Sequence, residues 1–401
     1  MLNNSVVFIL GIAKFDGAFE STSYTVAKYL AERNQVYYID YPYTWKDYFA
    51  KKDEAFKKRE HLFSTSSDGL LNTSHPNLKV VIVPPLLSIN FLPEGKIYRW
   101  LLRINESIIL KRVRKLIERT GISDYIFINS FNFHYPGVGK KLSPSLYVYH
   151  CVDPLVVQHD VKHGVISERQ IVEECDLVVC TSKQLYREKK AINSNTFFIP
   201  NAADITHSAK ARLPEVEVHS ALRGIPGPII GYFGNIERRI DYTLLAEVIS
   251  LLPNCSFVFA GPVEQQWIPE NFRKPANVHF IGRIPYPEMP AVLKGFDVAM
   301  IPFKKDEVSN TIFPLKLFEY LGTGKPVVAT DFNIDLKEFT KDSINYTSNA
   351  ADFVQSIKNA LENDSEAAKA ARIAIAAENS WKKRLDELSE LLDSNNTQTL
   401  I

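Results

Sequence analysis

The sequence predicts an α/β protein with two Rossmann-like domains, each built on a doubly wound parallel sheet. The first observation is length, because a chain of 401 residues exceeds the size at which one hydrophobic core stops growing. The second is pattern: apolar runs of strand length alternate with longer helical patterns, which is typical of parallel sheets covered by helices on both faces. The third is a polar interruption near the middle of the chain, after which the alternation starts again.

The domain boundaries follow from this interruption. After residues 200–204 the periodicity lapses into a polar connector, which ends at a Gly- and Pro-rich stretch over residues 224–228. We therefore expect a first domain over residues 1–205, a linker over 206–227, a second domain over 228–365 and C-terminal helices over 366–401. Ligands of open parallel sheets bind beyond the carboxyl ends of the strands, so we expect the two domains to face a cleft.

Each domain has its own series of elements. In the first we expect strands at 6–10, 35–40, 78–83, 125–129, 145–149, 177–181 and 196–199, with helices at 21–33, 97–119 and 168–174. In the second we expect strands at 229–233, 256–260, 278–281, 298–301 and 326–329, with helices at 242–251, 288–294 and 311–321. Residues 51–77 are polar and have no sustained period, so we expect a loop or a mobile flap there.

Composition excludes several classes of protein. With 47 basic and 46 acidic residues the formal net charge is +1, which argues against a protein that binds nucleic acid. No run of about 18 apolar residues occurs, so no membrane-spanning helix is expected. The N-terminal residues lack the basic lead and the cleavage site of a secretory signal. The four cysteines form no CxxC pair, which favours reduced, buried thiols in a cytoplasmic protein over disulfides.

The segment from Ser309 to Thr330 carries the strongest functional signal. It predicts polar cap residues, a short helix with Lys316 and Glu319 on one face, a Gly-rich stop and a buried strand. Backbone N–H groups at a helix start favour phosphate, Lys316 adds a positive charge, and Glu319 can accept hydrogen bonds from hydroxyls. A ligand with a phosphate next to a sugar would satisfy all three. The alternative is an ordinary amphipathic surface helix, against which Pro314 in the first turn and the Gly-rich end argue.

Two turns of the second domain are expected at the same edge of its sheet. The turn Gly231–Asp241 follows a strand and precedes a helix, and its glycines permit close approach of the backbone to a ligand. Of the two arginines that follow, one is expected to point to solvent and the other, Arg239, to fork onto a diphosphate. Gly282 and Arg283 end another strand there, and an ordinary βα turn explains them equally well.

One strand end of the first domain carries candidate catalytic groups. The segment Tyr147–Pro154 runs from a strand into a loop and includes His150 and Asp153. A lone His in such a place is usually structural, and a lone Asp before Pro usually forms a turn. Because both lie at the carboxyl end of one strand, a catalytic role and a structural role stay equally open.

No metal site and no cofactor are expected. The nine histidines are scattered, and no acidic pair of the DxD type lies near a strand end. We therefore expect a metal-independent site, in which arginine, lysine and the helix dipole meet the charge that a divalent ion would otherwise neutralise.

A basic amphipathic segment runs from Lys96 to Arg119. Eight basic residues stand against two acidic ones, and apolar residues at helical spacing provide one apolar face. One interpretation is a solvated helix packed on its sheet. The other adds adsorption to an anionic membrane surface, helped by the apolar stretch over residues 84–93. The second interpretation predicts a cytoplasmic, peripheral protein on the inner face of the plasma membrane.

These motifs resemble those of a known family. The donor domain of GT-B nucleotide-sugar glycosyltransferases, near glycosyltransferase family four, is similar to the stretches Gly231–Asn235, Gly261–Pro262, Asn277–Gly282, Phe296–Val298 and Pro314–Thr330. Among its members the chain looks most like bacterial enzymes that build teichuronic-acid-type and other cell-surface polysaccharides. The segments Tyr149–Asp153 and Ile199–Asp204 also match in type and order, so the likeness covers nearly the whole chain.

The resemblance implies an activity and a set of contacts. It implies transfer of a sugar from a nucleoside diphosphate sugar, a substrate and not a cofactor, to a lipid-linked or oligosaccharide acceptor that enters from the first domain. Glu319 would bind the ribose hydroxyls, and Lys316 with Arg239 would neutralise the diphosphate. Gly282 and Arg283 would flank the base, and the C-terminal helices would cross back to the first domain. The implied donor-binding residues are Gly234, Asn235, Arg239, Arg283, Thr311, Lys316 and Glu319, and the catalytic candidates are Asp153 and His150.

One position departs from the pattern of that family. Retaining members carry a Glu eight residues before the second one, where this chain has Thr311. An inverting enzyme would need a general base, for which Asp153 with His150 could serve, whereas a retaining one needs mainly charge stabilisation at the donor. The stereochemical outcome, the base, the sugar, the acceptor, the linkage and the oligomeric state stay open. So do two other functions, a GT-B sugar-nucleotide epimerase and a non-catalytic sugar-nucleotide-binding partner of a polysaccharide assembly complex.

Overall fold

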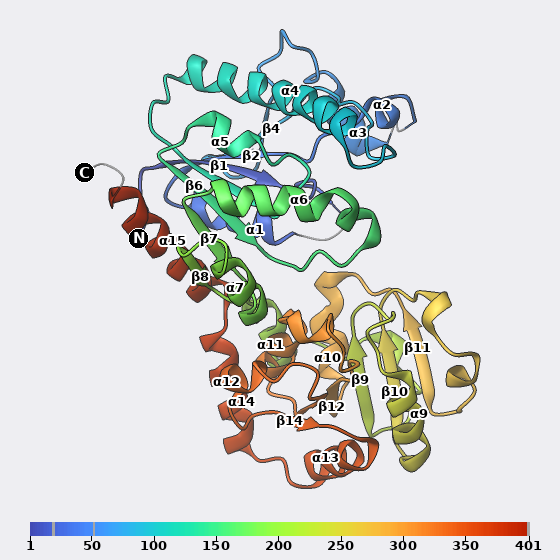
Figure 1. Cartoon of the computed structure of the whole chain (residues 1–401). Helices are drawn as coiled ribbons and strands as arrows, with labels where there is room; N and C mark the ends of the chain where they lie inside the picture. The colour runs from blue at the N-terminus through green and yellow to red at the C-terminus, as the bar shows by residue number, and fades with distance from the viewer. Residues whose placement is uncertain (18–20, 51–52, 399–401) are drawn as a thin grey trace. The chain divides into compact units, whose positions relative to one another are not determined.

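The chain forms two compact units in the computed structural model, which describes residues 1–17, 21–50 and 53–398. The first unit comprises Met1–Pro200 together with the segment from Leu385, and the second comprises Asn201–Arg384. Each unit contains one sheet with helices packed against it, as Figure 1 shows. The predicted fold class, two α/β units on parallel sheets, is confirmed.

The first unit is built on an eight-stranded sheet in the order β3-β4-β2-β1-β5-β6-β7-β8. Its neighbouring strands run parallel except for β3 and β4. The strands are β1 (Val6–Gly11), β2 (Gln35–Ile39), β3 (Leu70–Asn72), β4 (Leu78–Val81), β5 (Ile126–Ser130), β6 (Leu146–Cys151), β7 (Leu177–Cys180) and β8 (Thr196–Phe198). The strand order reverses between β1 and β5, so the topological switch point lies there.

Helices cover both faces of this sheet. Tyr37 stacks on Phe8, with ring centroids 4.9 Å apart, on the face that carries α4. Its neighbour Tyr38 hydrogen-bonds to Ser23 of α1 at 3.0 Å on the other face. Because successive side chains of a strand point to opposite faces, both sides of the sheet need apolar residues, as the sequence predicted. The helices are α1 (Thr22–Ala31), α2 (Trp45–Ala50), α3 (Glu54–Glu60), α4 (Lys96–Thr120), α5 (Val138–Leu142), α6 (Gln158–Glu174) and α7 (Lys183–Lys190).

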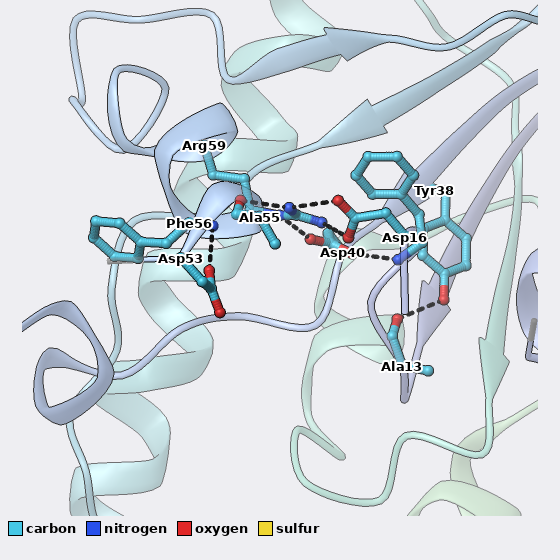
Figure 2. Close-up of polar contacts among 9 residues, drawn as sticks. Ala13, Asp16, Tyr38, Asp40, Asp53, Ala55, Phe56 and Arg59 are labelled. Atoms are coloured by element: carbon cyan, nitrogen blue, oxygen red, sulfur yellow. Dashed lines mark hydrogen bonds and ion pairs between the residues drawn. The ribbon is translucent and has the colours of Figure 1, made fainter. Parts of the chain in front are cut away.

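The segment 51–77 is not the loop that the sequence predicted, since it contains α3 and β3; its residues 51 and 52 lie outside the described residues. The side chain of Asp53 caps α3 by accepting a hydrogen bond from the backbone N–H of Phe56 at 2.8 Å. From the same helix the buried Arg59 forms ion pairs with Asp16 and Asp40, drawn in Figure 2. The prediction failed because a helix that is held by a buried charge shows little apolar periodicity.

The second unit is built on a six-stranded parallel sheet in the order β11-β10-β9-β12-β13-β14. The strands are β9 (Ile229–Phe233), β10 (Ser256–Ala260), β11 (Val278–Gly282), β12 (Val298–Ile301), β13 (Val327–Thr330) and β14 (Asn345–Thr347). The helices include α8 (Ile205–Ala209), α9 (Tyr242–Leu251), α10 (Met289–Lys294), α11 (Leu315–Gly322), α12 (Leu336–Thr340) and α13 (Ala350–Glu362). The strand order reverses between β9 and β12, which is the switch point of this sheet.

Helix α11 begins four residues later than the predicted start at Thr311. Residues 309–311 form a short 3-10 helix, and Ile312 is extended with ψ 131°. Pro314 then caps α11 with φ −76° and ψ 120°. A residue that precedes proline is disfavoured in helical conformation, so the helix cannot run through Phe313. Lys316 and Glu319 still share one face of α11, opposite its buried residues Leu317, Phe318, Tyr320 and Leu321.

The C-terminal residues form two helices with different partners. Helix α14 (Glu366–Glu378) packs on α11 in the second unit, whereas α15 (Trp381–Gln398) contributes to the first unit from Leu385 onward. In the first unit the backbone N–H of Leu2 donates to the side chain of Ser389 at 3.0 Å. The hydroxyl of Tyr29 on α1 donates to Asp386. These contacts attach α15 to the elements that begin the chain.

Candidate functional site

Three glycine turns form the carboxyl edge of the second sheet. The backbone N–H of Gly234 donates to the carbonyl of Ala260, and that of Gly261 donates to the carbonyl of Gly282, both at 2.8 Å. The φ angles of the three glycines are 144°, 143° and 78°, values that other residues rarely adopt. A Cβ on Gly261 would collide with the carbonyl of Gly234. The ends of β9, β10 and β11 therefore lie backbone to backbone, which only glycine permits.

Lys316 extends from α11 to this edge. Its Nζ donates a hydrogen bond to the hydroxyl of Tyr232 at 2.6 Å. It also lies 4.2 Å from the ring centroid of Tyr232 and 5.2 Å from that of Phe303. A Cβ on Gly234 would come within 2.5 Å of this nitrogen, so the ammonium group lies directly over the glycine turn. In the part of the chain that the structure describes, Lys316 forms no ion pair with a carboxylate.

The surroundings of Lys316 disfavour its charge. Burial lowers its pKa, and repulsion by the guanidinium of Arg239 lowers it further, whereas Glu319 and Glu237 act in the opposite direction. The outcome is a pKa of about 7 in place of 10.5. An anion beside the ammonium would favour the charged form, so this group gains more from an anionic ligand than an ordinary lysine does.

Arg239 lies beside Lys316 at the end of the turn that follows β9. Its guanidinium forms an ion pair with the buried Glu237 and lies 5.5 Å from the ring centroid of Phe303, the ring that Lys316 also faces. The two positive groups thus flank one aromatic ring, and Glu237 pairs with only one of them. A ligand with more than one negative charge suits this arrangement, because each group can meet its own anionic oxygen.

Glu319 lies on α11, one turn after Lys316. Burial raises the pKa of its carboxyl group, and the hydroxyl of Tyr286 donates to its Oε1 at 3.0 Å. Tyr286 follows β11, and its own carbonyl is 2.8 Å from Nε2 of His207. A carboxylate offers about four lone-pair positions. Glu319 can therefore accept hydrogen bonds from ligand hydroxyls in addition to the one from Tyr286.

The other predicted donor residues lie in the loops next to these groups. Asn235 is exposed, and its carbonyl accepts a hydrogen bond from the hydroxyl of Tyr232 at 2.9 Å. Arg283 is exposed in the loop between Gly282 and Tyr286. Thr311 is the last residue of the 3-10 helix that precedes α11. The structure thus brings together Gly234, Arg239, Lys316 and Glu319. It places Asn235 and Arg283 in adjoining loops and Thr311 in the short 3-10 helix before α11.

Three tyrosines of this edge were not predicted as site residues. Tyr232 holds the ammonium of Lys316, and Tyr286 holds Glu319. The hydroxyl of Tyr320 accepts a hydrogen bond from the N–H of Phe233 at 2.8 Å and donates one to its carbonyl at 3.1 Å, which fixes the turn before Gly234. An aromatic residue within a strand or helix indicates a core position. No sequence spacing could have linked these residues to partners 33 to 87 positions away.

The candidate catalytic residues lie in the first unit. His150 is buried in β6, with Nδ1 3.3 Å from the hydroxyl of Ser130 on the neighbouring β5. Burial lowers its pKa to about 4, so the imidazole is neutral at pH 7. Asp153 is exposed in the loop after β6. Both residues lie at the carboxyl end of the same strand, as the sequence predicted.

Helix α4 uses part of its basic side chains inside the first unit. Arg112 is buried and donates to backbone carbonyls of residues 62–67, and Arg99 forks onto Glu94 at 2.7 and 2.9 Å. Large apolar side chains are exposed near its first turn instead, namely Phe91 (78%), Ile97 (70%) and Trp100 (60%). None of the described helices is long and apolar enough to cross a membrane.

Side chains that could hold a metal do not gather anywhere in the described residues, where no group of three or more His, Cys, Asp or Glu is arranged for one. The four cysteines, Cys151, Cys175, Cys180 and Cys255, are free and buried, as predicted.

Solved structures share the architecture of the whole chain. Sucrose-phosphate synthase of Thermosynechococcus elongatus is 15% identical, with a TM-score of 0.64 over 98% of this chain and 99% of that one. HepE of Anabaena in complex with UDP is 16% identical, with a TM-score of 0.64 over 97% and 100%. The UDP-forming α,α-trehalose-phosphate synthase of Burkholderia vietnamiensis is 10% identical, with a TM-score of 0.68 over 100% and 99%. The chain therefore has the GT-B fold.

Sequence comparison defines the second unit more closely. Residues 227–363 match the family model Glycosyl transferases group 1, so this part of the chain is a domain of that family. TuaH of Bacillus subtilis strain 168, whose name assigns it to teichuronic acid biosynthesis as a glycosyltransferase, is 30% identical over 173 residues. The match covers 41% of this chain and 43% of TuaH, which is less than half of either protein. The predicted resemblance to GT-B glycosyltransferases is thereby confirmed.

Proposed function

We propose that the chain is a glycosyltransferase that moves a sugar from a nucleoside diphosphate sugar to a glycan acceptor. The observation that carries the proposal is the ammonium of Lys316, which lies over a glycine turn at the switch point of the second sheet with a lowered pKa. Lys316 has no carboxylate as a counter-ion among the described residues, and a diphosphate would serve as one. Structures of HepE with UDP and with UDP-glucose, which share the fold, agree with a uridine nucleotide.

In this proposal the donor-site residues have separate roles. Lys316 and Arg239 bind the diphosphate and stabilise the charge that grows on it as its bond to the sugar breaks. Glu319 accepts hydrogen bonds from the ribose hydroxyls, while Arg283 lies beside the base. Because two cationic side chains meet the charge of the leaving group, we propose a metal-independent reaction.

The acceptor hydroxyl is assigned to the first unit. Asp153 is the exposed member of the candidate pair and so the one that can meet a hydroxyl directly, whereas His150 lies behind it in the strand. We propose Asp153 as the group that receives the hydroxyl proton, with His150 in support.

We further propose a lipid-linked acceptor in cell-surface polysaccharide synthesis and a peripheral position on the inner face of the plasma membrane. The teichuronic acid assignment in the name of TuaH and the exposed Phe91, Ile97 and Trp100 support this. Sedimentation with phosphatidylglycerol vesicles tests it. The double variant Phe91→Ser/Trp100→Ser should stay in the supernatant, whereas Trp267→Ser, which removes an exposed Trp of the second unit, should sediment like the wild type. Equal recovery of all three proteins in the supernatant would refute membrane binding.

A nucleotide panel tests the donor site. UDP, GDP and ADP and their glucose derivatives are compared by thermal shift, and the sugar nucleotide that stabilises the protein is then used for turnover. Lys316→Met removes the charged contact to phosphate, and Glu319→Gln removes the charge of the carboxylate and exchanges one accepting oxygen for a donating amide group. Each variant should therefore lower affinity about tenfold. Lys305→Met, which removes an exposed lysine of the same unit, is the matched control. Unchanged binding by both site variants would refute the donor site.

Product analysis separates the two other functions. An epimerase would convert the sugar nucleotide when no acceptor is added. A non-catalytic partner would bind it without ever releasing nucleoside diphosphate. Either result would replace the transferase proposal while leaving the donor site in place.

A further inference from the structure

Tyr286 connects the loop after β11 to the carboxylate of Glu319 on α11. Its hydroxyl donates to Glu319 Oε1 at 3.0 Å, although the residue is 45% exposed and water could satisfy the same hydroxyl. Pro285 and Pro287 flank Tyr286. Proline restricts its own φ and the conformation of the residue before it, so the backbone of Tyr286 has little freedom. The hydroxyl is therefore presented to Glu319 from a defined position.

His207 of α8 contacts both the backbone and the ring of Tyr286. Nε2 of the imidazole lies 2.8 Å from the carbonyl oxygen of Tyr286, and the two ring centroids are 4.7 Å apart. A carbonyl oxygen only accepts, so the imidazole donates this hydrogen bond. Asp204 caps α8 by accepting a hydrogen bond from the backbone N–H of His207 at 2.9 Å. His207 is thus held by its own helix and restrains Tyr286 at two points.

Helix α8 also packs directly on α11, the helix that carries Glu319. A Cβ on Gly322 of α11 would lie 2.6 Å from Ser208 Oγ and 3.4 Å from the side chain of Ile205. Gly322 follows Glu319 by three residues, so this contact lies within one helical turn of the carboxylate. Three elements, α8, α11 and the loop after β11, are therefore joined around Glu319.

The hydrogen bond from Tyr286 affects both the charge and the orientation of Glu319. Burial raises the pKa of the Glu319 carboxyl group, whereas the hydrogen bond from Tyr286 and the charge of Lys316 lower it, and the nearby Asp204 raises it. A carboxylate accepts with both oxygens, whereas a protonated carboxyl group uses one of them as a donor. The contact with Tyr286 therefore favours the ionised form, and it also restricts rotation of the carboxylate. This form in a fixed orientation is the one that can accept from two neighbouring hydroxyls of a ligand.

We propose that Tyr286 is a positioning residue that orients the Glu319 carboxylate for the ribose hydroxyls of the nucleotide, and that His207 holds Tyr286 in place. The inference rests on the proposed function for the contact between Glu319 and the ribose. It adds that the preference of the site for a ribose depends on a tyrosine that acts through Glu319. The effect of Tyr286 is therefore confined to ligands whose sugar carries the hydroxyls.

Isothermal calorimetry with UDP and with 2′,3′-dideoxy-UDP, which lacks both ribose hydroxyls, tests the inference. The wild-type protein should bind UDP about tenfold more tightly than the dideoxy form. Tyr286→Phe should weaken the binding of UDP about fivefold and change that of the dideoxy form by less than about twofold, because only UDP uses the carboxylate. Where the nucleotide panel selects GDP or ADP, the same comparison uses the dideoxy form of that diphosphate.

Further variants separate a positioning role from other roles. In a Glu319→Ala background Tyr286→Phe should have no further effect, because Tyr286 acts through that carboxylate. His207→Phe should reduce the preference for UDP, and His207→Gln, which keeps an N–H donor, should restore most of it. Tyr346→Phe is the matched control, because it removes a hydroxyl from β14 at the opposite edge of the same sheet. Circular dichroism confirms that each variant folds.

Three outcomes would overturn the inference. These are an unchanged preference for UDP in Tyr286→Phe, equal binding of UDP and the dideoxy form by the wild type, or a further fivefold loss from Tyr286→Phe in the Glu319→Ala background. The last result would mean that Tyr286 contacts the ribose itself. In each case the proposed function stands if Lys316→Met weakens the binding of UDP. A wild-type protein that binds none of UDP, GDP and ADP would instead refute the proposed function, and this inference with it.

Discussion

Replacement of Arg59 by methionine should destabilise the first unit strongly, because the side chain is fully buried between two carboxylates. Its Nε donates to Asp40 at 2.8 Å, and its two amino groups donate to Asp16 at 2.5 and 3.0 Å (Figure 2). Methionine has a similar length but no charge. It would leave Asp40, whose side chain is 3% exposed, without its counter-ion, whereas Asp16, at 21%, could still meet water.

The size of this loss in folding free energy depends on the protonation state of Asp40 in the variant. Burial raises the pKa of this carboxyl group even in the wild type, and Arg59 opposes the rise. Without Arg59 the carboxylate of Asp40 would take up a proton in the folded state. Protonation at pH 7 of a carboxyl group whose ordinary pKa is 3.8 costs about 4 kcal/mol, because each pH unit above the pKa adds about 1.4 kcal/mol. Loss of one partner of a buried ion pair costs about 3–5 kcal/mol in other proteins, in agreement. The deficit should shrink by about 1.4 kcal/mol for each pH unit from 7 toward 5, because protonation becomes easier.

Calorimetric melting and hydrogen exchange measure this effect. For a unit of about 200 residues the melting temperature of Arg59→Met should fall by roughly 10 °C at pH 7, and α3 should lose its exchange protection. The control is the double variant Arg59→Met/Asp40→Leu, which removes the unpaired charge and should recover most of the loss. A single variant that melts within about 2 °C of the wild type with α3 still protected would refute the reasoning.

Three further predictions concern the second unit. Gly234→Ala should weaken nucleotide binding about tenfold or more, because the new Cβ would come within 2.5 Å of Lys316 Nζ and because alanine rarely adopts the φ of 144° found here. Isothermal calorimetry with UDP checks this prediction, and an unchanged affinity would contradict it. Tyr320→Phe should lower the free energy of unfolding by about 1 kcal/mol or more in denaturant melts, since the partly buried N–H of Phe233 loses its partner. A change below about 0.5 kcal/mol would contradict this prediction. The free energy of unfolding should rise with pH from about 7 toward 10.5, because the folded state loses the proton of Lys316 at a lower pH than the unfolded state does. Denaturant melts across this range should show the rise in the wild type and a smaller rise in Lys316→Met. Equal slopes for the two proteins would contradict the lowered pKa of Lys316.

Much of the fold could be predicted because buried parallel strands are continuous apolar runs. The bounds of β9, β10 and β12 agree with the predicted ones, β11 ends one residue later than predicted, and β13 is shifted by one residue at both ends. The failures have particular causes. Helix α3 is held by Arg59, whose partners Asp16 and Asp40 lie 43 and 19 residues earlier, so no local pattern announced it. The start of α11 was missed because the restriction that Pro314 places on the preceding residue outweighs the polar residues before it.

The candidate site was predictable only where its residues are close in sequence. Lys316 and Glu319 share one face of one helix, so their spacing in the sequence predicted that they lie together. Arg239 was preferred on chemistry alone, and the structure places its guanidinium over the ring of Phe303, beside Lys316. Tyr232 and Tyr286 contact the site from other strand ends, where a tyrosine in sequence indicates a core or loop position. Such contacts arise from the sheet order, which brings distant strand ends to one edge.

Lys316 should bind the diphosphate of the nucleotide in its protonated form, and the uptake of a proton on binding tests this directly. With a pKa of about 7, Lys316 is mostly neutral at pH 8, and a bound diphosphate would restore its proton. Calorimetric titration with UDP at pH 8, in two buffers that differ in ionisation enthalpy, should therefore show uptake of about one proton per nucleotide by the wild type. Lys316→Met should show no uptake and weaker binding. UDP binding without proton uptake, or equal uptake by both proteins, would contradict the account.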